Sequence, residues 1–461
     1  MRRAIWWGGV VLLLAAGAFW YYRAHRSPPD VLLITIDTLR ADHLGLYGYE
    51  RDTTPALDRW FDDALIFERA YSTDANTSPS VMSLLSGRYP QDHRVRLLYQ
   101  LDPGAAPLLP ALLPEVYQTA GFVSNVVLTE EAIGIGHYFD HYDDYVDQPE
   151  PLRPIYERNA ARTTDAVLAW LAESRDRDRP LFLWVHYIDP HGPYLTPPGW
   201  KHHFHHEGRV EIDTTKVPEY QRINDEMDGL DYVDRYDEEI AYMDSEVGRL
   251  LDGCAKLLDL DDALVVFTAD HGETMMQGER WFAHGYHVYE PIVHVPLMLR
   301  GRGVPSGRRS GVVSLADLVP TLLRVTDGKH PDEPVDPTAG WSGIDLVRGG
   351  GEDPDRVVFS EGSYLAGQVR AAITQRRKWM ALVERGTHTV RARRFYELDT
   401  DPLEERARDW PEPLDARADS LLRLIASDPD PGGIPDSLRE GIQIDAPKVA
   451  PNLTEEQREK L

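Results

Sequence analysis

The chain of 461 residues is predicted to form an α/β fold, in which a mixed sheet lies between layers of helices. Two observations predict this class. Three runs of apolar and β-branched residues have the continuous pattern of strands that are buried on both faces of a parallel sheet. Helical periodicity separates these runs, and the alternation of strands with helices favours a sheet covered on both sides. The strand-like runs are 31–36, 181–186 and 263–268, and the clearest helical patterns are 160–173 and 235–257.

Residues 1–29 are predicted to be a membrane anchor or a signal segment. Arg2 and Arg3 precede an apolar run at 4–22, which as a helix spans roughly 28 Å, close to the hydrocarbon thickness of a bilayer. Small residues at 16–18 allow a cleaved signal peptide, whereas aromatic residues at both ends of the run favour an uncleaved transmembrane helix. Both interpretations predict that the main domain is exported, to the periplasm or the cell exterior.

The rest of the chain divides into three parts that differ in composition and in the pattern of apolar residues. The main α/β domain is predicted at 30–349. From about residue 350 the pattern changes to short apolar runs between turn formers, which predict a small antiparallel sheet in a C-terminal α+β subdomain at 350–430. Residues 431–461 are rich in Pro, Asp and Glu and are predicted to be a polar tail. The short runs are 357–359, 369–373, 379–382 and 394–398.

The net charge of −27 restricts the partners that this chain can have. Its long-range field repels nucleic acid and anionic lipid headgroups, so neither is expected as a partner. An anionic substrate needs a local cation to overcome the same field, which favours a metal site.

A thiolate metal site is excluded because Cys254 is the only cysteine, and no internal disulfide is possible. Cys254 falls within a helical pattern and is interpreted as a small apolar helix residue. The histidine-rich segment 201–206 is interpreted as a solvated polar stretch and not as a metal site.

Polar residues follow each of the three predicted strands. Asp37 follows the first, Asp189 and His191 follow the second, and Asp270 and His271 follow the third. Ligands of open α/β sheets bind beyond the carboxyl ends of the strands, so these groups are predicted to share one site. Simpler interpretations remain open, with Asp37 as a helix cap and His191 as a histidine of a surface turn.

The segment 76–90 carries the most specific motif of the chain. Pro79 and the run at 85–90 fit a signature that reads Cys or Ser, any residue, Pro, any residue, Arg, and closes on a Leu-(Thr/Ser)-Gly-Arg-Tyr-Pro-like run. The segment resembles that signature, which belongs to the sulfatase family, although Thr77 stands in place of the cysteine and Val81 in place of the arginine. Other segments resemble the same family in the same order: 37–49, 186–194, 270–273, 282–285 and 395–398.

The resemblance implies the alkaline-phosphatase-like mixed sheet and a divalent metal ion beneath the nucleophile. It implies roles for six residues. Asp37, Asp270 and His271 would be metal ligands, and Thr77 would be both a ligand and the nucleophile. His191 would face the substrate, and His284 would assist the leaving group. Carboxylate ligands suit Ca²⁺ or Mg²⁺, whereas His271 admits Zn²⁺ or Mn²⁺ equally well.

Three departures from the family bear on the chemistry. Thr38 stands where many members have a second aspartate, and the lysine and histidine pair of many members is not recognisable near 122–125. Thr77 cannot become formylglycine, whose hydrate has two hydroxyls on one carbon. A bound metal can promote loss of the single Thr77 proton, and the resulting covalent ester would be released by water or another acceptor.

The main hypothesis is therefore a membrane-anchored, exported, metal-dependent hydrolase of anionic esters. The threonine chemistry favours phosphate esters, whereas the overall resemblance favours sulfate esters. One alternative is a phosphotransferase that acts on lipid or envelope substrates, because Thr77 and its neighbours also resemble the one-metal sites of such enzymes. Another is a catalytically inactive binding protein on the same fold, because the second aspartate and the arginine are missing.

Overall fold

The computed structural model describes residues 28–149, 156–223, 226–278, 280–326, 343–364, 367–384 and 386–429. The strands of its main sheet are β1 (Val31–Ile36), β2 (Leu65–Tyr71), β3 (Gln118–Val123), β4 (His141–Asp143), β7 (Leu181–Tyr187), β8 (Leu264–Ala269), β9 (His294–Val295), β10 (Leu297–Gly301) and β11 (Gly307–Ser314). The helices are α2 (Pro55–Trp60), α3 (Thr77–Ser86), α4 (Pro90–His93), α5 (Leu109–Leu112), α6 (Glu130–Ile133), α7 (Ala160–Glu173), α8 (Gly229–Cys254), α9 (Glu290–Val293), α10 (Leu318–Thr326) and α11 (Ala416–Ser427). A separate two-stranded ribbon consists of β5 (Gln148–Pro149) and β6 (Tyr156–Glu157).

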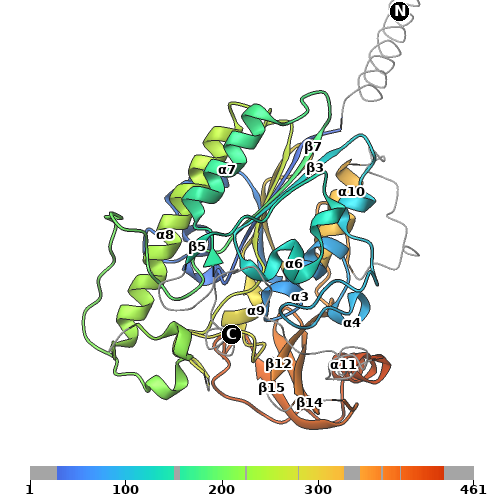
Figure 1. Cartoon of the computed structure of the whole chain (residues 1–461). Coiled ribbons are helices and arrows are strands. Elements are labelled where there is room, and N and C mark those ends of the chain that lie inside the picture. The colour runs from blue at the N-terminus through green and yellow to red at the C-terminus, as the bar shows by residue number, and fades with distance from the viewer. Residues whose placement is uncertain are drawn as a thin grey trace, which may run out of the picture.

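The main sheet has nine strands in the order β11-β2-β10-β8-β1-β7-β3-β4, with β9 paired to β2. It is mixed, because β10 runs antiparallel to both β8 and β2. Helices α7 and α8 cover one face, and α3 and α10 cover the other (Figure 1). The predicted α/β architecture is confirmed.

The three predicted strands form the centre of this sheet. β1 pairs in parallel with β7 on one side and β8 on the other, and all six of its residues are buried. The register places Ile36 opposite Tyr187 and Ala269, so the three strands end at the same level. This alignment is what brings the residues that follow them together.

The two predicted helices are also present, and one is longer than expected. α7 has the predicted bounds, whereas α8 begins at Gly229, six residues before the predicted start at 235. Asp228 caps α8, because its side chain accepts a hydrogen bond from the Leu230 N–H. Gly229, Asp231 and Asp234 interrupt the apolar pattern in this first part of α8, which hid it from a search for apolar periodicity. The helix also ends at Cys254, three residues before the predicted end at 257. Cys254 is buried at the end of this helix, as predicted.

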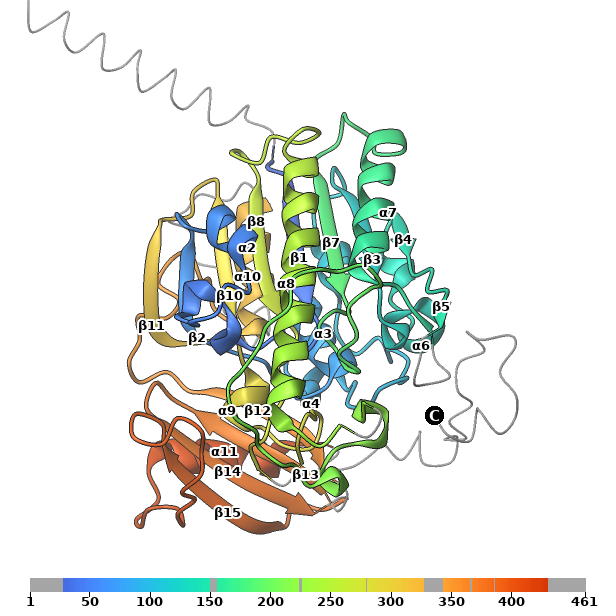
Figure 2. The same cartoon turned by 90° about the vertical axis from the view of Figure 1, so that its left-hand side faces the viewer.

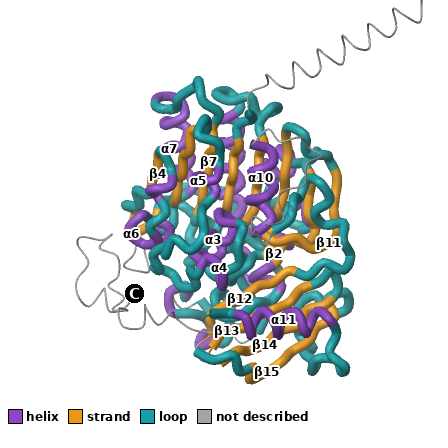
Figure 3. The backbone as a smooth tube through the Cα atoms, turned by 90° about the vertical axis from the view of Figure 1, so that its right-hand side faces the viewer, coloured by secondary structure: helices purple, strands orange, loops and turns teal. Residues whose placement is uncertain are grey.

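The C-terminal subdomain contains the predicted antiparallel sheet. Its four strands are β12 (Val358–Tyr364), β13 (Gly367–Ile373), β14 (Arg377–Glu384) and β15 (Val390–Glu397), in that order. Helix α11 covers one face of this sheet, and Trp379, Phe395 and Leu421 pack between them (Figure 3). The sheet lies against the main body below α9 (Figure 2), where a second apolar cluster joins Tyr71 and Val288 to the subdomain.

Among the described residues, no helix is both long enough and apolar enough to cross a membrane. The predicted transmembrane helix at 4–22 and the predicted tail at 431–461 lie outside the described residues.

Candidate metal centre and active site

The carboxyl ends of the central strands bring three of the predicted ligands together. Asp37 directly follows β1, and Asp270 and His271 directly follow β8. The backbone continues the ladder across this point, because the Asp270 N–H donates to the carbonyl of Ile36 at 3.1 Å. His271 Nε2 lies 3.7 Å from Asp37 Oδ1 and 3.7 Å from Asp270 Oδ2. All three side chains are fully buried.

Thr77 reaches the same point from another element. It is the first residue of α3, a helix of ten residues that are all buried. Its hydroxyl oxygen lies 3.4 Å from Asp37 Oδ2 and 3.3 Å from His271 Nε2. The N-terminus of a helix favours negative charge, because its first N–H groups have no partner within the helix. The predicted nucleophile therefore lies where an anion would be stabilised.

The atoms that face one another at this site are mostly hydrogen-bond acceptors, and few of them carry a hydrogen atom to donate. His271 Nδ1 lies 2.9 Å from the carbonyl of Gly272, which requires the proton on Nδ1 and leaves a lone pair on Nε2. Asp37 Oδ1 and Asp270 Oδ2 are buried and accept no hydrogen bond. Buried oxygen atoms without partners are rare, and a divalent cation would satisfy both of them. The described residues thus fit a metal ion.

The charge states of the ionisable groups at this site also favour a bound metal ion. Burial, and then the nearby charge of Asp37, raises the pKa of the Asp270 carboxyl well above its usual value. Burial alone would also raise the pKa of Asp37, but the neighbouring histidines His186, His191 and His271 outweigh it and hold this pKa well below its usual range. Burial, with His284 beside it, lowers the pKa of His271 to about 3, so this ring is neutral and able to act as a ligand.

Two further residues, His186 and Asn125, lie at the site, and neither was predicted from the sequence to be a metal ligand. His186 Nε2 lies 3.7 Å from Asp37 Oδ2 without a hydrogen bond, and His186, Asp37 and Asp270 form a group that could hold a metal ion. The Asn125 side chain donates to Asp37 Oδ2 at 2.5 Å. Asn125 follows β3, so extending the strand-end rule to the next parallel strand would have found it.

Of the two predicted catalytic histidines, His284 lies beside the predicted ligand His271, and His191 lies beside His284. The ring centroids of His284 and His271 are 4.7 Å apart, and those of His191 and His284 are 5.1 Å apart. His191 also stacks with Tyr220 at 6.3 Å. The ring of His287, a third histidine near His284 in the same loop, instead lies 5.0 Å from that of Tyr289.

Glu273 fixes the orientation of His284. Its carboxylate is fully buried and lies 2.8 Å from His284 Nδ1. The same carboxylate accepts hydrogen bonds from the Tyr194 hydroxyl and, at 3.1 Å, from the Gln221 side chain. With Nδ1 donating to Glu273, the Nε2 atom of His284 remains to exchange a proton with a substrate. The sequence motif contained Glu273, but its role became visible only with these contacts.

The residues that depart from the family pattern bring no charge to the site. Val81 lies fully buried in the apolar core. Thr38 is buried too, and its N–H donates to Asp270 Oδ1 at 3.3 Å while its hydroxyl has no hydrogen-bond partner. Neither position can replace the arginine or the second aspartate of the family.

A sheet whose strand ends carry buried acids, histidines and a helix-terminal hydroxyl defines a hydrolase of the alkaline-phosphatase-like class. The family model described as Sulfatase matches residues 29–328. The chain therefore belongs to the sulfatase family and is a hydrolase of that family, which confirms the resemblance noted in the sequence.

The relatives and solved structures agree with this placement. An N-acetylgalactosamine-6-sulfatase of Canis lupus familiaris is 24% identical over 402 residues, which cover 75% of this chain and 70% of that one. An arylsulfatase of Clostridium perfringens is 24% identical over 466 residues, 86% of this chain and 93% of the relative. The structure of BT4656 in complex with its substrate D-glucosamine-2-N,6-O-disulfate has a TM-score of 0.66 at 17% identity and covers 87% of this chain and 97% of its own. A phosphonate monoester hydrolase of Agrobacterium radiobacter has a TM-score of 0.60 at 19% identity and covers 82% and 91%.

Proposed function

We propose that this protein is a metal-dependent hydrolase of sulfate or phosphate esters, with the unmodified hydroxyl of Thr77 as its nucleophile. The observation that carries the proposal is the position of this hydroxyl at the N-terminus of α3, within 3.4 Å of both Asp37 Oδ2 and His271 Nε2. The hydroxyl can donate its one hydrogen to only one of these two atoms, so lone pairs still face one another at the site unless a cation joins the group.

Asp37, Asp270 and His271 would hold the cation, with Thr77 as the fourth ligand. When bound, a divalent cation supplies a Lewis acid that favours loss of the hydroxyl proton and stabilises negative charge on the ester. The carboxylates suit Ca²⁺ or Mg²⁺, and the histidine admits Zn²⁺ or Mn²⁺.

The remaining steps of the reaction depend on side chains of the protein. The Thr77 hydroxyl releases its proton to solvent, its oxygen attacks the central phosphorus or sulfur atom, and the bond from that atom to the leaving oxygen breaks. His284, protonated on both ring nitrogens, donates its Nε2 proton to the leaving oxygen, while Glu273 holds its Nδ1–H. His191, beside His284, holds an oxygen of the transferring group. Water then attacks the central atom of the Thr77 ester and gives a proton to the neutral Nε2 of His284, and the departing Thr77 oxygen takes a proton from solvent to restore the hydroxyl.

The type of ester depends on how the covalent intermediate is released. Threonine has one hydroxyl, so it cannot expel the group by elimination from a geminal diol, and water must attack the central atom. This requirement favours a phosphate ester, whereas the names of the curated relatives favour a sulfate ester.

The test is a substrate panel with purified protein in Mg²⁺, Ca²⁺, Mn²⁺ or Zn²⁺. We expect hydrolysis of para-nitrophenyl phosphate, para-nitrophenyl sulfate or the bis(para-nitrophenyl) phosphate diester, and a fall in kcat of about 10³-fold or more in Thr77→Ala. Thr326→Ala is the matched control, since Thr326 is equally buried and its hydroxyl donates to backbone carbonyls of its own helix, α10. Activity in Thr77→Ala equal to that of the control would end the assignment.

A second candidate is a phosphotransferase that passes the Thr77-bound group to an alcohol of a lipid or envelope component. The observation that favours it is the same unmodified threonine, since an alcohol can attack the covalent ester as water does. Product analysis with a phospholipid donor separates the two. A phosphorylated acceptor supports transfer, and free phosphate as the sole product supports hydrolysis.

We also propose that residues 1–29 anchor the protein in a membrane and that the main domain is periplasmic or extracellular. The apolar run at 4–22 with its flanking arginines supports this. Cell fractionation of the full chain and of a chain that starts at residue 30 checks it. Recovery of the full chain in the cytosolic fraction would contradict the proposal.

A further inference from the structure

We propose that strand β12 of the C-terminal subdomain is a positioning element of the active site, and that Asp74 is the side chain through which it acts. The loop concerned is the nucleophile loop, residues 72–76, which leads directly into Thr77. The inference depends on the proposed role of Thr77 as nucleophile. It concerns how the nucleophile is held at the correct distance from His284.

The backbone of β12 pairs with the nucleophile loop as if the loop were one more strand. The Ala75 N–H donates to the carbonyl of Glu361 at 3.0 Å, and the Glu361 N–H donates to the carbonyl of Thr73 at 2.9 Å. The Ser360 hydroxyl donates to the carbonyl of Ser72. The C-terminal sheet therefore extends to within two residues of the nucleophile.

The side chain of Asp74 carries this contact on to the residue before Thr77. Asp74 Oδ1 accepts hydrogen bonds from the Asn76 N–H at 2.9 Å and from the Asn76 side-chain amide at 3.0 Å. Asn76 stands at the N-cap of α3 but makes no capping bond with its side chain. Asp74 therefore determines where the Asn76 amide points.

That amide lies against the loop that carries His284. Gly285 has a φ of +83°, and a Cβ atom at this position would lie only 2.6 Å from Asn76 Oδ1. β12 touches the same loop directly, since a Cβ atom at Gly362 would lie 3.3 Å from Ala75 and 3.5 Å from the carbonyl of Gly285. One short stretch of β12 thus contacts both catalytic loops.

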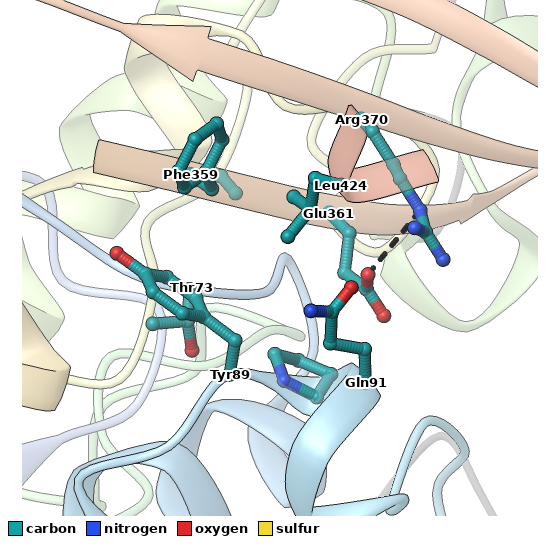
Figure 4. Close-up of a pocket in the computed structure, with 9 residues that line it drawn as sticks. Thr73, Tyr89, Gln91, Phe359, Glu361, Arg370 and Leu424 are labelled. Atoms are coloured by element: carbon teal, nitrogen blue, oxygen red, sulfur yellow. Dashed lines mark ion pairs between the residues drawn. The ribbon is translucent and has the colours of Figure 1, made fainter. Parts of the chain in front are cut away.

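Buried charges hold β12 in place at this point. Glu361 pairs with Arg96 of the main body at 2.9 Å and with Arg370 of β13 at 3.4 Å, and Asp428 pairs with both arginines. Figure 4 shows the Glu361–Arg370 pair at the edge of a pocket between the two parts of the molecule. Thr73, Tyr89, Gln91, Phe359 and Leu424 also line this pocket. Removing one partner of such a set leaves a buried charge uncompensated, so the interface resists displacement.

Burial, and then the charge of Glu361, raises the pKa of Asp74 well above its usual value. Both bonds from Asn76 reach the single oxygen Oδ1, so Asp74 serves the loop as a hydrogen-bond acceptor. An asparagine can accept the same two bonds through its side-chain oxygen, whereas an alanine cannot. This difference makes a conservative variant available for the test.

The experiment compares Asp74→Ala, Asp74→Asn and the control Glu384→Gln, which changes an exposed ion pair with Arg391 on the same sheet. We expect Asp74→Ala to lower kcat about 10–100-fold with KM changed less than about threefold, because small misplacements of reacting groups have effects of this size. Asp74→Asn and the control should stay within about threefold of the native kcat. A native kcat in Asp74→Ala, or an Asp74→Asn variant as slow as Asp74→Ala, would overturn the proposal.

Hydrogen exchange tests the same claim without any substrate. Asp74→Ala should speed exchange about tenfold or more in peptides covering residues 72–80 and 283–290, whereas Asp74→Asn and Glu384→Gln should leave both unchanged. Unchanged exchange in both peptides of Asp74→Ala would refute the coupling. If native protein hydrolyses no ester, the proposed function fails while this measurement still decides the positioning role. If Asp74→Ala does not fold, Ser360→Ala removes one bond of the same contact and should speed exchange at 72–80.

Discussion

Among the residues that the structure describes, two groups of histidine and aspartate satisfy the same geometric condition for holding a metal ion, yet they differ in burial and in hydrogen-bond partners. In one group, Asp37, His186 and Asp270 are buried at the strand ends. The other group contains His206, Asp231 and Asp234 and lies at the surface, where 42% of the Asp231 side chain is exposed. Residue types and spacing alone do not separate them.

The hydrogen-bond partners of the two groups do distinguish them. At the surface group, His206 Nδ1 lies 2.6 Å from Asp234 Oδ2, and Arg51 lies 2.6 Å from Asp234 Oδ1. The hydrogen bond with Asp234, together with the nearby acids, raises the pKa of His206. Positive charge from the chain itself already compensates these acids. At the buried group two carboxylate oxygens lack any partner. A cluster thus indicates a metal when its acceptors are buried and no side chain supplies the missing positive charge.

The largest expected difference between the two groups is in metal binding and catalysis. His271→Ala should remove the bound divalent metal and lower kcat/KM about 10³-fold, because Lewis-acid stabilisation contributes several kcal/mol to the transition state. His206→Ala makes the same chemical change at the surface group and should alter neither. Elemental analysis and kinetics check both variants. Loss of metal in His206→Ala with retention in His271→Ala would reverse the comparison.

The next effect concerns the histidines that line the buried group. His284→Gln should lower kcat about 10²–10³-fold, since this is the usual contribution of a general acid. The loss should be greater for an alkyl ester than for a para-nitrophenyl ester, whose leaving group needs no proton. Glu273→Gln should have a smaller effect of about 10–100-fold by releasing His284. His287→Gln is the matched control in the same loop, and an equal loss there would argue against the assignment of His284.

A smaller effect tests buried acids that have no cation nearby. Asp189 and Glu239 are buried together, and burial raises the pKa of Asp189 to about 7. Burial and Asp189 also raise the pKa of Glu239 well above its usual value. The folded protein therefore keeps a proton that the unfolded chain releases, so this stability is present at low pH and is lost as pH rises through about 7. Glu239→Gln should flatten the fall in Tm between about pH 5 and pH 8 by a few degrees. Asp252→Asn, which changes an exposed acid on the same helix, should not. An unchanged slope in Glu239→Gln would contradict the shared proton.

The smallest effect is expected at the surface group. The folded-state pKa of His206 is raised, so its contribution to stability is complete below the unfolded value of about 6.5 and is lost as pH rises through the folded value. His206→Gln should lower Tm by at most about 2 °C near pH 5.5 and leave it unchanged near pH 9, because exposed ion pairs contribute little. Thermal melts at the two pH values check this. An equal decrease at both would mean that packing, and not charge, is lost.

The strands and helices that build the centre of the molecule were largely predictable. Runs such as 31–36 and 181–186 are apolar throughout because both faces of a central parallel strand are buried, and this pattern is visible without any tertiary information. The mixed part of the sheet was not predicted in detail. β2, β10 and β11 pair across long separations in the chain, and the local sequence has no signal for which strands become partners.

The site was predictable in its residue types and less so in its contacts. Asp37, Asp270, His271 and Thr77 were singled out by strand ends and by a motif, and the structure brings them together. His186 and Asn125 acquired their places from the register of β7 beside β1 and of β3 beside β7. The contact of β12 with the nucleophile loop joins residues nearly 290 positions apart, from Ser72 to Ser360, which no local pattern can indicate.

By itself the sequence determined the family, the layered α/β fold and the set of side chains able to bind metal and attack an ester, because these depend on local apolar patterns and on residue chemistry. Only the tertiary structure decided which of the 17 histidines present a lone pair to a buried acid and which form ion pairs at the surface. The physical reason is that the role of an imidazole or a carboxylate depends on the donors within about 3 Å of it. Those donors come from strands and loops that are distant in the chain and become neighbours only in the folded protein.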